Sequence, residues 1–288
     1  MSNIKDSLII AQITDLHIGF DGEGQVCQNS RSLRKVISEL NNLIAKPDVV
    51  VLTGDLVESG EDWAYQKLRE QLKRIQCPIY YALGNHDNRA AFLKNFPEIQ
   101  QNEGYVQYVI EDLPIRIIIL DTHGEGLHGG EFCEKRAAWL TRTLAKAPDR
   151  PTLIAMHHPP IKTGIAWMTT KENAPWVKRF RAAIKPHKNV VHIIAGHIHR
   201  TIFQQIANTT ISVCEAVAPE VKLELAPIEI DTPDDRTLLL DSTPSYGLHH
   251  WDGSQLTSHF ARASGARPIV KFDKAHAFVV RKTLDKPK

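Results

Sequence analysis

Aspartates, histidines and an asparagine recur in this sequence directly after short apolar runs. The segments "TDLH", "TGDL", "GNHD", "MHHPP" and "GHIH" each follow a stretch rich in Ile, Val, Leu or Ala. Carboxylates, imidazoles and amide oxygens suit hard or borderline divalent cations, and no thiolate is among them. The candidate ligands are Asp15, His17, Asp55, Asn85, His157, His197 and His199.

Seven donors are too many for one tetrahedral ion, but they suit two ions that share a bridging carboxylate. Two such cations can hold a phosphate, activate water at neutral pH and stabilise both the attacking and the leaving oxygen. Gly54, Gly84 and Gly196 each precede a candidate ligand, where we expect the chain to turn tightly. The residues therefore predict a two-metal centre that can hold a phosphate and activate water.

Apolar runs alternate with segments of helical spacing over the first 200 residues, which predicts a layered α/β fold. In open α/β sheets, ligands gather outside the carboxyl ends of the strands, where the candidate ligands stand. Strands are expected at 8–14, 48–54, 78–85, 151–157 and 189–197, with an antiparallel pair within 105–121. Helices are expected at 32–45, 61–75, 88–95, 133–146 and 173–185.

Beyond residue 200 the pattern changes to strands without helices. We expect a hairpin that turns at Asn208, strand-like segments within 222–241, and a hairpin that turns at Asp252-Gly253. The apolar stretch 218–250 is interpreted as a lid or a dimer contact, so a homo-oligomer is expected. The predicted division is a catalytic core at 1–215, closing strands with a cap or oligomerisation extension at 216–280, and a tail at 281–288.

Composition limits the classes of partner that the protein is expected to bind. The 288 residues are 42% hydrophobic and carry a formal net charge of +2, which gives no electrostatic case for a long nucleic acid or a membrane surface. The widely spaced Cys27, Cys77, Cys133 and Cys214 argue against a structural zinc site or a disulfide framework. No signal-peptide pattern and no run of about 20 apolar residues is found. We expect a cytoplasmic protein.

In their order and intervals, the five motifs resemble the calcineurin-like metallophosphoesterase superfamily over about residues 8–200. The resemblance implies a four-layer αββα sandwich, here with a small C-terminal cap or β extension, and a dinuclear centre between its sheets. It implies a metal-activated hydroxide attacking phosphorus, with Mn²⁺, Fe²⁺ or Fe³⁺, Zn²⁺ and Co²⁺ all compatible with the donors. The ligands implied are Asp15, His17 and His199 for the first metal, Asn85, His157 and His197 for the second, and Asp55 between them.

The resemblance also narrows the substrate. Ser59 and Leu83 stand where the serine/threonine phosphoprotein phosphatases of this superfamily carry arginines that clamp a phosphoryl dianion. A diester has one negative charge and needs less cationic clamping, which favours a phosphodiesterase. The motifs resemble bacterial class III cyclic-nucleotide phosphodiesterases and the related glycerophosphodiesterases. We expect 3′,5′-cyclic AMP or another cyclic nucleotide as substrate, with a glycerophosphodiester as the alternative. A broad monoesterase/diesterase and a non-catalytic scaffold rank below both.

His86 matches the family's active-site histidine, which contacts the scissile phosphate or helps the leaving group depart. We expect His86, Asn85 and Asp55 to be catalytic, and Asn85, His86, His199 and Trp167 to contact the substrate. Trp167 and Met168 either line the pocket rim, where a base could stack, or pack under a loop.

The sequence leaves the roles of several other polar residues open. Glu58 either orients His86 or is a surface carboxylate, and Asp87 either orients His86 or, in the favoured interpretation, caps the helix that follows. We expect His158 to support the site or the structure, and His192 to lie in the core. No role is assigned to His128, His249 or His250, while His123 could border the cleft.

Overall fold

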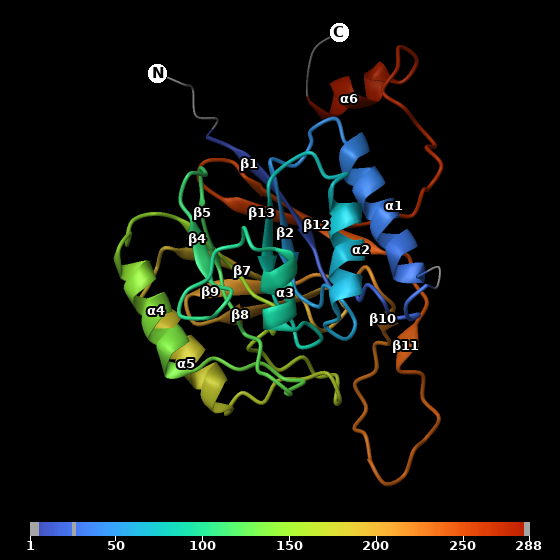
Figure 1. The fold of residues 1–288 in the computed structure, drawn as a ribbon. Helices are drawn as coiled ribbons and strands as arrows, with labels where there is room; N and C mark the ends of the chain where they lie inside the picture. Colours follow the sequence, from blue (N-terminus) through green and yellow to red (C-terminus); the bar gives the residue numbers. More distant parts are fainter. Residues whose placement is uncertain (1–5, 25–26, 285–288) are drawn as a thin grey trace.

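Two β-sheets packed face to face, with helices on their outer surfaces, form the body of the molecule (Figure 1). The computed structural model describes residues 6–24 and 27–284. Within them the first large sheet has the strand order β13-β12-β1-β2-β3, and the second has the order β4-β5-β6-β7-β9-β8. The predicted layered α/β fold is confirmed.

In the first sheet β1, β2 and β3 are parallel, and β12 closes it by pairing antiparallel with β1. Its strands are β1 (Leu8–Ile13), β2 (Val49–Thr53), β3 (Ile79–Ala82), β12 (Ser245–Trp251) and β13 (Leu256–Arg262). The helices that follow β1, β2 and β3 in the chain are α1 (Gln28–Asn42), α2 (Asp62–Leu72) and α3 (Arg89–Asn95).

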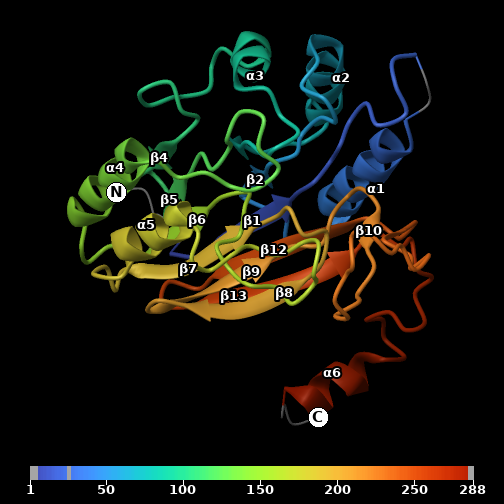
Figure 2. The same ribbon diagram turned by 90° about the horizontal axis from the view of Figure 1, so that it is seen from below.

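In the second sheet β5, β6, β7 and β9 are parallel, with β4 and β8 antiparallel at the two edges. Its strands are β4 (Tyr108–Ile110), β5 (Arg116–Ile119), β6 (Thr152–Ala155), β7 (Val190–Ala195), β8 (Ile202–Ile206) and β9 (Thr209–Val213). The connecting helices α4 (Glu134–Ala145) and α5 (Pro175–Ile184) pack side by side on its outer face (Figure 2).

Alternation along the strands explains why they are apolar throughout. Ile117, Ile119 and Leu153 face the first sheet and join its core. Ile118 and Ile154, one residue along, join the core formed with α4 and α5. Successive side chains of a strand point to opposite faces, so a strand covered on both faces needs apolar residues at every position.

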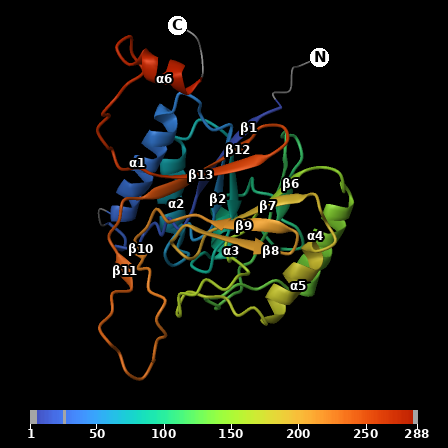
Figure 3. The same cartoon turned by 180° about the vertical axis from the view of Figure 1, so that it is seen from behind.

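The sequence predicted both C-terminal hairpins, β8–β9 and β12–β13, and the structure confirms them. The strand-like segments expected within 222–241 are wrong apart from the short β11 (Leu239–Leu240), which pairs with β10 (Glu220–Val221) just before that range. Between them the chain forms a loop that projects from the body (Figures 1 and 3). Its apolar residues Leu225 and Ile230 are exposed, because no sheet lies beside the loop to cover them.

The C-terminal segment carries a short helix, α6 (Ala277–Thr283), that the sequence pattern did not predict. It stands clear of both sheets (Figure 2). Residues 285–288 of the predicted tail lie outside the described residues. None of the helices described here is long and apolar enough to cross a membrane.

Candidate metal centre

The loops that leave β1, β2, β3, β6 and β7 meet at one end of the sandwich and bring the predicted ligands together. Each set below has ligand atoms within 4.8 Å of one another. The sets overlap, which places the side chains in one continuous cluster. They are Asp15, His17 and His199; Asp15, Asp55 and His157; His157, His158 and His197; and His17, Glu58 and His86.

Asp55 lies between the two halves of this cluster. Its Oδ2 is 3.6 Å from His17 Nε2 on one side and 3.2 Å from His157 Nε2 on the other. On the first side His199 Nε2 is 3.2 Å from His17 Nε2 and 3.4 Å from Asp15 Oδ1. The geometry therefore gives Asp55 the position that a bridging carboxylate needs.

The backbone around the cluster is strained. Eight described residues other than glycine have a left-handed φ, and five of them are candidate ligands. Such a conformation costs about 1–3 kcal/mol at each position and persists only where the surrounding structure enforces it. The five are Asp15 (52°), His17 (44°), Asp55 (48°), His197 (74°) and His199 (54°).

Two glycines permit the close packing of these loops. Gly54 has φ +95°, and a Cβ there would lie 2.5 Å from His157 Nδ1. A Cβ at Gly84 would lie 2.2 Å from Asp55 Oδ1. Gly84 is therefore required by a close approach rather than by a left-handed turn.

Three imidazoles are held from behind by oxygen atoms. His17 Nδ1 donates to Glu58 Oε2 over 2.7 Å, His157 Nδ1 to the Thr53 carbonyl over 2.7 Å, and His199 Nδ1 to the Pro219 carbonyl over 2.7 Å. Each bond leaves Nε2 as the free nitrogen and fixes the ring orientation, as is usual behind metal-ligating histidines.

Glu58 serves His17 more directly than His86. Its carboxylate bonds His17, whereas His86 Nδ1 lies 3.7 Å from Glu58 Oε1 and donates to the Glu58 backbone carbonyl over 2.8 Å. The residue thus positions both rings, one through its side chain and one through its main chain.

Asp87 does not cap α3, so the favoured prediction for this residue is wrong. The cap is Asn88, whose side chain accepts from the Ala91 amide. The buried Asp87 carboxylate instead accepts from the amides of Leu56 and Gly84 and from the Tyr65 hydroxyl. Burial, reinforced by the charge of Asp55, raises the pKa of Asp87 to about 7. Asp87 joins the loops after β2 and β3.

The charges of the cluster are set by burial and by its neighbours. Burial raises the pKa of Asp55, but the charge and hydrogen bond of His157 outweigh it and hold that pKa well below the usual range. Burial lowers the pKa of His157, yet Asp55 raises it to about 9. Burial and the charge of His157 lower the pKa of His197 to about 3. An ionised carboxylate and neutral imidazoles are the forms that bind metal, so a cation must displace the proton of His157.

Two atoms of the cluster fit a cation directly. Asn85 Oδ1 is buried and has no hydrogen-bond partner among the described residues, and the buried His157 Nε2 faces the Asp55 carboxylate at 3.2 Å. A buried polar atom without a partner costs about 1–3 kcal/mol. Both are lone-pair donors of the kinds that divalent transition-metal ions accept, so the residues present fit a metal centre.

His128 belongs to the site although the sequence gave it no role. Asn85 Nδ2 donates to His128 Nδ1 over 3.2 Å, and the His128 ring lies 5.1 Å from that of His197. The bond turns the Asn85 amide so that its oxygen is free for the centre. His128 comes from the glycine-rich stretch 124–130, which lies several residues beyond the end of β5, and only "GEGLHGG" marks it in the sequence.

The sequence placed His158 and His123 near the site, and neither of them lines the cavity at the centre. The buried His158 ring lies 4.7 Å from the rings of both His157 and His197, and its Nδ1 bonds the Thr122 hydroxyl at 2.9 Å. His123 is buried and is not among the residues that line the cavity at the centre. His158 therefore supports the ligand rings by packing against them.

A cavity of about 180 Å³ opens onto the centre. His17, His86 and His199 lie at its polar end. The remaining wall is mainly apolar and combines Phe20, Trp167, Met168, Val221 and Leu239. Trp167 thus stands at the rim of this cavity, 37% exposed.

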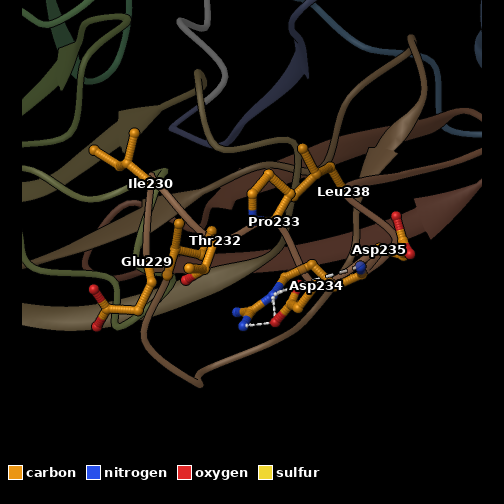
Figure 4. Close-up of a pocket in the computed structure, with 9 residues that line it drawn as sticks. Glu229, Ile230, Thr232, Pro233, Asp234, Asp235 and Leu238 are labelled. Atoms are coloured by element: carbon orange, nitrogen blue, oxygen red, sulfur yellow. Dashed lines mark hydrogen bonds and ion pairs between the residues drawn. The ribbon is translucent and has the colours of Figure 1, made fainter.

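A second hollow, of about 240 Å³, lies within the projecting loop (Figure 4). Glu229, Ile230 and Pro233 line it, and an ion pair between Asp234 and Arg236 braces it. None of the predicted ligands lines this hollow, so we assign the reaction to the cavity that opens onto the metal centre.

Comparison with known proteins agrees with this geometry. A family model described as calcineurin-like phosphoesterase matches residues 8–201, which include all the candidate ligands. The chain belongs to the calcineurin-like phosphoesterase family. The family assignment confirms a metal-dependent phosphoesterase, as the motifs predicted.

Several curated relatives are phosphodiesterases by name. A probable glycerophosphodiester phosphodiesterase of Arcobacter nitrofigilis is 33% identical, over 88% of this chain and 92% of that protein. A probable cyclic nucleotide phosphodiesterase of Rhodopseudomonas palustris is 40% identical, over 54% of this chain and 59% of its own length. Among solved structures, a dimetal phosphatase from Danio rerio shares the fold, with a TM-score of 0.59 and 15% identity over 87% of this chain and 98% of that one.

Proposed function

We propose that this phosphodiesterase hydrolyses a small, singly charged diester at the centre formed by the seven predicted ligands. The observation that carries the proposal is the lining of the cavity: no lysine or arginine is among its described lining residues, and its outer wall is apolar. A phosphate monoester dianion would lack a cationic clamp there, whereas a diester monoanion needs less. The residues proposed as ligands are Asp15, His17 and His199, then Asn85, His157 and His197, with Asp55 between the two sets.

Two divalent cations, for which Mn²⁺, Fe²⁺, Zn²⁺ and Co²⁺ are the candidates, would polarise the phosphoryl oxygens and lower the pKa of a water nucleophile there. The chain's own residues supply the remaining catalytic groups. His86 lines the cavity with its Nδ1 bonded to the Glu58 carbonyl, which leaves Nε2 for the substrate. In its imidazolium form it can donate a proton from Nε2 to the departing alkoxide.

We propose a glycerophosphodiester as the substrate. The cavity wall includes Val221 and Leu239, which belong to the β10–β11 pair beyond the residues that the family model matches. An alignment over 88% of the chain leaves only about 35 residues outside, so the two glycerophosphodiester phosphodiesterases matched at that coverage extend across this wall. Phe20 and Trp167 present aromatic surface that suits a quaternary ammonium headgroup.

The second candidate is 3′,5′-cyclic AMP. Trp167 and Met168 give the cavity a flat apolar rim on which a purine can stack. The names of several relatives support it, among them a cAMP/cGMP dual specificity phosphodiesterase of Mycobacterium tuberculosis that is 31% identical over 77% of this chain.

Initial rates on glycerophosphocholine, cyclic AMP and glycerol 3-phosphate, each over a concentration series with the Mn²⁺-loaded protein, test the proposal. We expect the highest kcat/KM on glycerophosphocholine and the lowest on the monoester, with activity lost in Asn85→Ala. A higher kcat/KM on cyclic AMP would keep the diester chemistry and replace the substrate. A higher value on the monoester would overturn both.

We also propose that the projecting loop mediates self-association. Leu223, Leu225 and Ile230 on this loop are 52%, 61% and 88% exposed, which is costly unless another surface covers them. Deleting residues 224–236 is expected to lower the sedimentation coefficient from that of an oligomer to that of a monomer. An unchanged coefficient contradicts this assignment.

A further inference from the structure

The C-terminal arm, residues 264–284, exposes large apolar side chains that nothing in the described structure covers. Ile269 is 95% exposed, Phe272 76% and Phe278 66%. Val270, Val279, Val280 and Leu284 are exposed as well. Seven exposed apolar residues within 16 positions are more than scattered surface hydrophobics explain, which marks the arm as a candidate interaction surface.

The same arm concentrates positive charge. It holds five Lys or Arg residues against one Asp, a net charge of +4, although the whole chain carries only +2. None of the five cations forms an ion pair within the described residues, and the carboxylate of Asp273 bonds His276 instead. The nearly balanced net charge of the whole chain, from which we expected no membrane partner, therefore conceals a cluster of positive charge in the arm. The five are Arg267, Lys271, Lys274, Arg281 and Lys282.

Helix α1 extends this basic surface at the root of the arm. Arg31, Arg34 and Lys35 are exposed on α1 and line a hollow of about 490 Å³ with Ser264, where the arm leaves the body. The three cations likewise form no ion pair among the described residues, and Glu39 is the one acidic residue in the lining. Basic side chains of α1 thus lie at the point where the arm leaves the body.

We propose that the C-terminal arm, with the basic face of α1, binds the surface of a bilayer that contains anionic phospholipids. Such a surface offers negative headgroups for the cations beside an apolar layer for Phe272, Phe278 and Ile269. A second copy of the arm offers only like charge, and a nucleic acid offers no apolar layer. α6 has seven residues, so the arm lies on the membrane and does not cross it.

Co-sedimentation of the purified full chain with vesicles tests the proposal, independently of which diester the enzyme hydrolyses. We compare vesicles of phosphatidylcholine alone with vesicles that also contain about 30% phosphatidylglycerol. Binding is expected only to the anionic vesicles, and it should fall as salt rises. Equal binding to both vesicle types, or no binding to either, overturns the proposal.

Three double variants separate the contributions. Lys271→Glu/Lys274→Glu and Phe272→Ser/Phe278→Ser should each weaken vesicle binding at least tenfold, whereas Lys146→Glu/Lys188→Glu, a matched charge change elsewhere on the surface, should retain most of it. Turnover of a soluble diester and circular dichroism should be unchanged in all three, because these side chains are exposed and outside the site. Equal loss in the control pair, or arm variants that alter the oligomeric state instead of vesicle binding, would contradict a membrane-binding arm.

Discussion

Two clusters of buried histidines lie between the sheets, and they differ in every respect that matters for chemistry. In the deeper cluster, His249 Nδ1 bonds Ser258 at 2.8 Å and Nε2 bonds Gln12 at 3.1 Å, while His192 Nε2 bonds Ser212 at 2.8 Å. These residues stand on regular strands. At the metal centre the Nδ1 atoms of His17, His157 and His199 are bonded from behind, while their Nε2 atoms face one another or a carboxylate. The backbone of five candidate ligands there is left-handed.

The difference shows that buried histidines alone do not make a site. Gln12 Nε2 reaches from β1 to the carbonyl of Ala195 on β7, so the deeper cluster works as a polar link between the two sheets. Burial lowers the pKa of His249 to about 3 and that of His192 to about 4, which keeps both neutral. Free lone pairs, strained loops and ionised carboxylates distinguish the metal cluster.

Asp55→Asn should break the metal cluster most severely, because Asp55 faces both halves. We expect metal content to fall below two ions per chain and kcat/KM to drop by roughly 10³-fold or more. Metal analysis and diester turnover measure the two effects. His249→Gln is the matched control in the deeper cluster and should retain both ions. Loss of metal in His249→Gln would contradict the distinction between the two clusters.

Glu58→Gln should have the next largest effect, since it weakens the hydrogen bond that holds His17. Losing such a partner behind a ligand typically costs about 10- to 100-fold in metal affinity or activity. Competition with a chelator measures the affinity. Unchanged affinity would mean that the Glu58 bond does not pre-organise His17 for the metal.

His128→Ala should release the Asn85 amide and weaken metal binding by about tenfold. The contacts that give His128 its role are with Asn85 and His197, both in the second half of the cluster, so only one of the two ions should bind more weakly in a Mn²⁺ titration. Leu127→Ala, an exposed neighbour on the same loop, serves as the control. A loss of both ions would assign His128 a general structural role.

Acid stability should report the protons that the deeper cluster excludes. Between pH 6.5 and about 4 the unfolded chain binds protons that folded His249 and His192 exclude, so their contribution is complete above pH 6.5 and declines as pH falls. Each contributes a slope of up to about 1.4 kcal/mol per pH unit. Denaturant unfolding of metal-free protein should show a smaller slope in His249→Gln than in the exposed control His250→Gln. Equal slopes would remove His249 as a cause.

The sequence could single out the candidate ligands because their signal is local: a polar side chain directly after an apolar strand. The roles of Glu58, Asp87 and His128 depend on which loops meet in space, and no local pattern encodes that. Alternating apolar residues within 222–241 predicted strands, but alternation does not reveal whether a neighbouring strand exists. The left-handed φ of five ligands likewise appears only in the folded loops.

The central claim is that this cluster holds two metal ions and that the deeper one holds none. Reconstitution with Mn²⁺, desalting and elemental analysis measure this directly on the native chain, Asn85→Ala and His249→Gln. We predict two ions per chain in the native protein and in His249→Gln, and one in Asn85→Ala. One ion or fewer in the native chain, or two in Asn85→Ala, would contradict the account.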